Sequence, residues 1–121
     1  MKFEDLDAWR KARLLVSEVY SLTRSKALRQ DFGLSSQIQR AAVSVMTNIA
    51  EGFEREGKAE KLNFYRIARA SCGEVRSLLY VIEDNYVETK DHPTGLRDDA
   101  NLTGRLISGL IASTQKREFK K

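Results

Sequence analysis

The sequence is poor in the residues that interrupt helices or build metal and redox sites. It contains one proline, one cysteine and one histidine in 121 residues. So little proline favours long helices, because proline disrupts a helix interior. One cysteine cannot form an internal disulfide, and one histidine cannot make a histidine-rich metal site. We therefore expect a helical protein of a reducing compartment, without a metal or other cofactor.

The sequence also predicts no segment that enters a membrane or directs secretion. No stretch approaches the roughly 20 apolar residues needed to span a bilayer. The N-terminal residues Met1–Asp5 are charged and lack the apolar run of a signal peptide. The composition, with 41% hydrophobic and 31% charged residues, is ordinary for a globular protein. We expect a single domain over residues 1–121, cytoplasmic and without a membrane partner.

Catalytic motifs are absent as well. The seven glycines form neither GxGxxG nor GxxxxGK[ST], and no HExxH or Cys-x-x-Cys spacing occurs. The single cysteine, Cys72, falls on the apolar side of a predicted helix, where an inert buried thiol is expected. We predict a non-enzymatic protein that acts by binding and assembly.

Helical periodicity is what the sequence does contain. Apolar residues recur at three-to-four-residue spacing over residues 5–24, 35–53, 58–87 and 94–116. The third segment is the most regular. Its inward-facing positions are Tyr65, Ala68, Cys72, Val75, Leu79, Ile82 and Tyr86.

Short connections separate these four segments. Leu28–Gly33 and Asp91–Gly95 are predicted to be non-helical, and Gly52 and Gly57 are predicted to mark the end of the second helix. No segment alternates with a period of two. Four amphipathic helices with short loops predict an all-α, antiparallel up-down four-helix bundle.

The second predicted helix has more apolar residues than a surface helix needs. Only two residues between positions 34 and 53 are charged. Val43, Met46 and Ala50 lie on the side that should face solvent, and no charge compensates them. Exposed apolar patches of this kind commonly mark an interface. We therefore predict a homo-oligomer with Val43, Met46 and Ala50 at the subunit interface.

A polar stripe runs along the same helix. It consists of Gln37, Arg40, Ser44, Asn48 and Glu51. We interpret it as a structural hydrogen-bonded network with Ser71 and Glu74 of the third helix, because buried polar groups need partners. An active site built between subunits from Asn48 and Glu51 is the weakest alternative.

One pattern on the third helix suggests a ligand. Its members, on one flank of the helix, are Arg66, Arg69, Gly73, Arg76 and Tyr80. Arginines at this spacing offer a row of phosphate donors, and a tyrosine can stack on a base. Lys116 and Arg117 add positive charge near the C-terminus. The alternatives are a ridge of intersubunit salt bridges and, for the C-terminal pair, a solvated tail.

Several of these positions resemble one protein family. The matching elements are Leu6, Trp9, Phe32-Gly33-Leu34, Gln37, Arg40-Ala41-Ala42, Ser44, Asn48-Ile49-Ala50-Glu51-Gly52, Phe64, Ala68, Ser71 and Glu74. The family is that of the small four-helix-bundle proteins encoded by intervening sequences within bacterial 23S ribosomal RNA genes. The resemblance covers Phe3 to about Leu110. It implies a bundle that assembles as a ring, typically a pentamer, and an association with ribosomal RNA genes.

A related branch is the accessory protein of diversity-generating retroelements, which looks like a basic barrel that binds a reverse transcriptase and nucleic acid. The present sequence departs from the family where a proline commonly precedes Phe-Gly-Leu, because the stretch here is Leu28-Arg29-Gln30-Asp31. Two functions stay open. One is an oligomer associated with RNA or DNA, and the other is a scaffold for a partner protein such as a reverse transcriptase.

Overall fold

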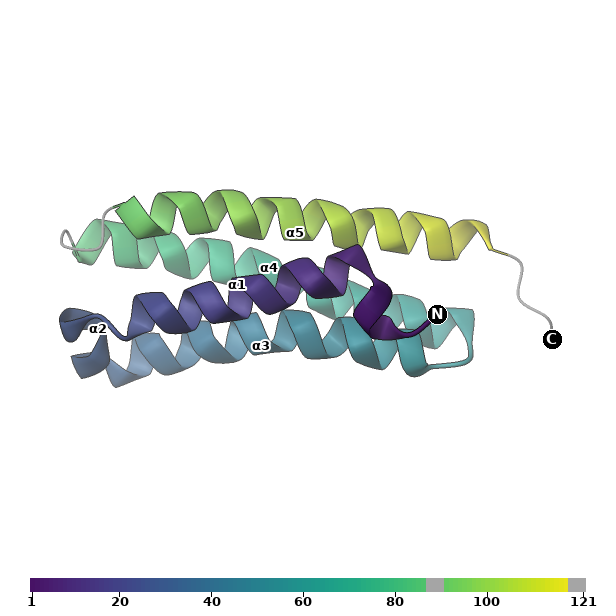
Figure 1. Cartoon of the computed structure of the whole chain (residues 1–121), viewed down its shortest axis with the longest axis horizontal. Coiled ribbons are helices and arrows are strands. Elements are labelled where there is room, and N and C mark those ends of the chain that lie inside the picture. The colour runs from purple at the N-terminus through teal and green to yellow at the C-terminus, as the bar shows by residue number, and fades with distance from the viewer. Residues whose placement is uncertain (87–90, 118–121) are drawn as a thin grey trace.

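Four long helices lie side by side in the computed structural model (Figure 1). The structure describes residues 1–86 and 95–117 in full, and residues 91–94 by their backbone alone. A turn of 3₁₀ helix, η1 (Phe3–Asp5), precedes the first long helix. The α-helices are α1 (Asp7–Thr23), the short α2 (Lys26–Gln30), α3 (Phe32–Glu54), α4 (Lys58–Asn85) and α5 (Asp91–Lys116).

Each long helix runs antiparallel to the one before it. α3 packs against α1 and α4, and α5 packs against α4 and α1, so the four helices close into a ring of neighbours (Figure 1). α4 makes its largest contacts with α3 and α5. The predicted antiparallel up-down four-helix bundle is confirmed. No strand occurs within the residues that the structure describes.

The structure corrects the predicted connection at Leu28–Gly33. Most of this stretch is helical, as α2 and then as the first turn of α3, which includes Gly33. Two capping side chains explain the difference. Ser25 and Asp31 each accept a hydrogen bond from the backbone N–H three residues further on. Such bonds satisfy N–H groups that the start of a helix leaves without an intrahelical partner.

The predicted turn at Asp91–Gly95 is also wrong, because α5 begins at Asp91. Pro93 therefore lies in the first turn of α5, where its missing N–H costs no intrahelical hydrogen bond. The predicted end of the third helix, Val87, falls outside the described residues, and α4 ends at Asn85. The other predicted helix ends differ from the observed ones by no more than three residues.

The core consists of two apolar clusters stacked along the bundle axis. One contains Leu15, Leu22, Ile38 and Leu79, and the other contains Trp9, Ile49, Tyr65, Cys72 and Ile107. The predicted inward face of the third helix is confirmed. All seven of its members are buried except Tyr86, which is half-buried.

Gly52 does not end the second long helix as predicted. It lies inside α3, which continues to Glu54 and ends where Arg55 turns to an extended conformation. No glycine in the described part of the chain has a positive φ. A Cβ at Gly52 would lie 2.6 Å from the Tyr65 ring. Gly52 therefore allows α3 and α4 to approach closely.

No helix in the described part of the chain is both long and apolar enough to cross a membrane.

Candidate nucleic-acid interface

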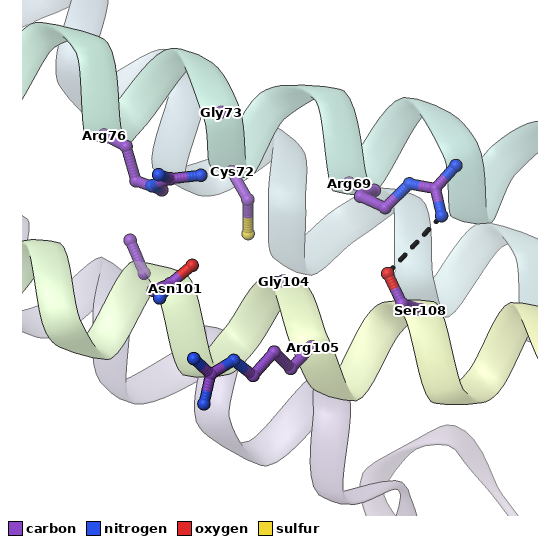
Figure 2. Close-up of a pocket in the computed structure, with 9 residues that line it drawn as sticks. Arg69, Cys72, Gly73, Arg76, Asn101, Gly104, Arg105 and Ser108 are labelled. Carbon is purple, nitrogen blue, oxygen red and sulfur yellow. Dashed lines mark hydrogen bonds between the residues drawn. The ribbon is translucent and has the colours of Figure 1, made fainter.

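A groove with a volume of about 340 Å³ lies between α4 and α5 (Figure 2). It contains no carboxylate. The residues that line it, hereafter the arginine groove, are Arg69, Cys72, Gly73, Arg76, Ala100, Asn101, Gly104, Arg105 and Ser108. In Figure 2, Arg69 and Arg76 extend from α4 over the space between the helices, and Asn101 and Ser108 approach from α5. Arg105 extends along the α5 side.

Two glycines line the groove, Gly73 on α4 and Gly104 on α5. A Cβ built on Gly73 or on Gly104 would meet no other heavy atom within 4 Å. Close packing therefore does not require glycine at either position. Glycine inside a helix is less stable than alanine by about 0.5–1 kcal/mol. The open space between α4 and α5 consequently comes with a cost in helix stability.

The floor of the groove is apolar and uncharged. Cys72 and Ala100 are both buried, and the thiol of Cys72 points toward the space between the helices (Figure 2). Burial raises the pKa of the Cys72 thiol to about 12, although the nearby positive charge of Arg76 opposes the shift. Because the thiolate is the reactive form, this cysteine is a poor nucleophile at neutral pH.

The arginines of the groove are weakly engaged by the protein itself. Arg69 donates a 3.4 Å hydrogen bond to the Ser108 hydroxyl and so bridges the two helices at one end of the groove (Figure 2). Among the described residues, no carboxylate forms an ion pair with Arg69, Arg76 or Arg105. Guanidinium groups without a carboxylate partner suit an anionic ligand, and above all a phosphate.

Positive charge extends beyond the groove along both helices. Residues 66–80 and 100–117 contain six basic residues and one acidic residue, a net charge of +5, whereas the whole chain carries +4. The one acidic residue, Glu74, accepts a 3.3 Å hydrogen bond from Gln37 of α3. All six basic side chains are exposed. These residues, hereafter the basic face, are Arg66, Arg69, Arg76, Arg105, Lys116 and Arg117.

Tyr80, the last member of the predicted row, is in a different environment from the arginines. Its side chain is half exposed, and the guanidinium of Arg97 lies 4.3 Å from the centre of its ring. Arg97 also donates a 3.1 Å hydrogen bond to the Tyr80 hydroxyl and pairs with Glu83 at 2.8 Å. One face of the ring is thus occupied by an arginine of α5. The structure places Tyr80 beside the groove and not within its lining.

Comparison with known proteins places this architecture in a family. The family model described as 23S rRNA-intervening sequence protein matches residues 4–109. The chain belongs to this family. A solved structure with the same fold is a Bacteroides thetaiotaomicron protein of the S23 ribosomal protein family, described as having unknown function. Its TM-score is 0.77 at 20% identity, over 86% of this chain and 97% of that one. No functionally curated protein matches.

The polar stripe of this intervening-sequence protein divides into separate contacts. The Ser44 and Ser71 hydroxyls lie 2.8 Å apart between α3 and α4, and the Asn48 amide donates to the Ser44 hydroxyl at 3.0 Å. Gln37 and Glu74 form the second cross-helix contact, described above. Glu51 instead pairs at 3.0 Å with Arg55, the exposed residue that follows the last residue of α3. The side chain of Arg40 is exposed and makes no hydrogen bond or ion pair with a described residue.

The apolar residues predicted at an interface are half-buried within the single chain. Met46 and Ala50 pack against the cluster that contains Trp9 and Ile49, and Val43 is partly covered as well. The apolar surplus of α3 is therefore smaller than its sequence indicates. The oligomer interface and the pentamer stay predictions, as does the relation to diversity-generating retroelements.

Sequence analysis missed the contribution of α5 to the groove. Asn101, Gly104, Arg105 and Ser108 attract no attention individually, because each is isolated among ordinary helix residues. One signal was available. Residues 100–117 contain three basic residues and no acidic residue, whereas residues 91–99 of the same helix contain three acidic residues. In the described part of the chain, no cluster of histidine, cysteine and carboxylate side chains is arranged to hold a metal ion.

Proposed function

We propose that this intervening-sequence protein binds nucleic acid through the basic face of α4 and α5 and has no catalytic role. The observation that carries the proposal is the concentration of positive charge on one part of α4 and on the neighbouring part of α5. Residues 66–80 and 100–117, on adjacent helices, together hold a net charge of +5, and the groove between the helices is lined by three arginines and no carboxylate. Phosphate contacts by Arg and Lys provide most of the affinity of sequence-independent binding. The family's description, which names ribosomal RNA, supports RNA as the first ligand to test.

The proposal is tested by titrating labelled RNA and DNA with the protein at low ionic strength and following fluorescence anisotropy. A variant with Arg69→Gln, Arg76→Gln and Arg105→Gln should lose most of its affinity. The matched control carries Arg24→Gln, Arg29→Gln and Arg40→Gln, three exposed arginines outside the basic face. It loses the same charge and should keep most of the affinity. Absence of binding by the wild-type protein at low salt would overturn the proposal.

We also propose that the protein assembles with itself through the outer face of α4. Ile67 and Val81 are 41% and 42% exposed, and they lie on the same side of the helix with Ala70, Glu74 and Ser77 between them. Exposed apolar side chains in such a row favour contact with another chain. The resemblance to ring-forming relatives makes a pentamer the expected state.

Sedimentation velocity tests this second proposal. Ile67→Lys with Val81→Lys should shift the protein toward monomers, whereas Leu102→Lys, an equally exposed apolar residue on α5, should not. If the arginines instead serve subunit contacts, the Arg66→Ala, Arg69→Ala and Arg76→Ala variant should dissociate. An oligomer that survives the Ile67 and Val81 substitutions contradicts this choice of surface.

A further inference from the structure

We infer that the arginine groove receives a nucleotide unit of a single strand, so that the protein selects single-stranded over duplex nucleic acid. This inference rests on the proposed function and deepens it. Binding to a basic surface alone would favour neither form strongly, because both offer phosphates. The inference concerns the groove, and it can fail while the charge-driven binding stands.

The size of the groove is the first argument. Its volume of about 340 Å³ lies at the lower end of the range for small-ligand sites, roughly 300–1,000 Å³. A site of this size accepts one nucleotide and excludes the body of a duplex. In a duplex the bases are stacked and paired, and extruding one costs a few kcal/mol. A single strand presents its bases without that cost.

The chemistry of the lining is the second argument. The groove has an apolar floor at Cys72 and Ala100, and guanidinium groups at its rim. A nucleotide has the matching division, with a flat base at one end and a phosphate at the other. Guanidinium planes stack on bases as well as bind phosphates. The side chains of Asn101 and Ser108 supply hydrogen-bonding groups beside the floor (Figure 2).

The paired glycines are the third argument. Gly73 on α4 and Gly104 on α5 both line the groove, and a side chain at either would extend into open space. Alanine at these positions would be more stable in an isolated helix. The two glycines therefore leave space beside the groove unfilled at a cost in helix propensity, and a ligand in the groove would make use of that space.

The experiment fills the groove without changing its charge. Gly73→Leu combined with Gly104→Leu places two side chains in the space, whereas Gly109→Leu adds the same side chain on α5 outside the lining. The probes are a short unstructured RNA, the RNA duplex of the same length, and a mononucleotide as competitor. Circular dichroism and thermal melting establish that each variant folds. Gly73→Ala with Gly104→Ala provides a graded, less bulky version.

The wild-type protein should bind the single strand at least about tenfold more tightly than the duplex, the scale of one base stacked on a protein side chain. The double leucine variant should lose this preference and keep its affinity for the duplex. The double alanine variant should lose less of the preference for the single strand, and Gly109→Leu should behave as wild type. Equal affinity for strand and duplex, or a preference that survives the leucines, overturns the inference.

Three outcomes separate the groove assignment from the proposed function. A mononucleotide that binds as tightly as the strand would overturn the assignment to a strand, because the groove would then take a free nucleotide. Failure of the wild-type protein to bind any of these probes at low salt would overturn the proposed function itself. Binding to strand and duplex alike, unaffected in the filled variants, would overturn the groove assignment alone.

Discussion

The ring of Tyr65 lies against the backbone of Gly52, where α4 crosses α3. A Cβ at Gly52 would be 2.6 Å from Cε1 and 2.7 Å from Cδ1 of that ring, and 3.1 Å from the carbonyl oxygen of Lys61. Tyr65 is fully buried and cannot swing into solvent. The glycine of the Asn-Ile-Ala-Glu-Gly element is therefore a packing requirement. The contact fixes the distance between the two helices at this end of the bundle.

Gly52→Ala should destabilise the protein by about 1–3 kcal/mol, the usual cost of inserting a methyl group into a well-packed contact. The free energy of unfolding from urea titration provides the measurement. The control is Gly109→Ala on α5, where a Cβ meets nothing within 4 Å. It should raise stability by about 0.5–1 kcal/mol through helix propensity and lost unfolded-state entropy. Two changes of the same sign would refute the role given to Gly52.

Ser44 and Ser71 should be energetically coupled across α3 and α4. Ser71→Ala removes one partner of the 2.8 Å contact and should cost about 1 kcal/mol, because the Ser44 hydroxyl then keeps only Asn48. Replacing both serines by alanine should cost less than the sum of the single changes, since neither hydroxyl is left behind. Urea denaturation of the four proteins measures the coupling. Strict additivity would show that the two hydroxyls do not interact.

The acidic pair between α1 and α5 should make stability depend on pH. The pKa of Glu18 is raised to about 7, first by burial and then by the hydrogen bond with Asp99 and the negative charge of Asp99, while Lys11 opposes the shift. Lys11 also pairs with Asp99 at 3.1 Å. Burial alone would raise the pKa of Asp99, but its hydrogen bonds with Glu18 and Lys11 lower that pKa below the usual value.

The direction in which stability changes with pH follows from the proton on Glu18. The folded protein holds this proton up to about pH 7, whereas the unfolded carboxyl releases it near pH 4.5. The stabilising contribution is complete below the lower value and is lost as the pH rises through the upper one. Glu18→Gln keeps a donor toward Asp99 but cannot titrate. The melting temperature of the wild type should therefore fall relative to that of Glu18→Gln between about pH 5 and pH 8.

The control for this measurement is Glu56→Gln, which changes an exposed carboxylate in the loop between α3 and α4. Its melting temperature should follow the wild type across the same range. Parallel curves for wild type and Glu18→Gln would contradict the assigned proton. Because Glu18 is only partly buried, we expect a modest effect that solvent screening reduces further.

Much of the fold could be predicted from the sequence, because helical periodicity is a local signal. The seam of the third helix was identified residue by residue, since its three-and-four spacing leaves only one side that can face the core. The short α2 was missed because it depends on the caps at Ser25 and Asp31 and not on periodicity. The role of Gly52 was predicted wrongly because a glycine near a helix end can either end the helix or allow a second helix to approach closely. Only the position of Tyr65 distinguishes a helix end from a close approach.

The candidate site was only half predictable. The α4 arginines fall in a regular row, so their shared flank follows from helix geometry alone. Tertiary packing decides which helix lies beside that flank, and the sequence pattern does not show it directly. The position of α5 next to α4 is what makes groove-lining residues of Asn101, Gly104, Arg105 and Ser108. For the same reason the position of Arg97 against Tyr80 could not be foreseen.

The central claim is that the basic face binds nucleic-acid phosphates, and the salt dependence of binding tests it most directly. The observed affinity for single-stranded RNA should fall linearly on a plot of log affinity against log salt concentration, with a slope of about −0.7 per phosphate neutralised. Removing Arg69, Arg76 and Arg105 should make the slope shallower by about 2, because three contacts are lost. The Arg24, Arg29 and Arg40 control should keep the wild-type slope. An unchanged slope in the groove variant, or the same change in both variants, would contradict the account.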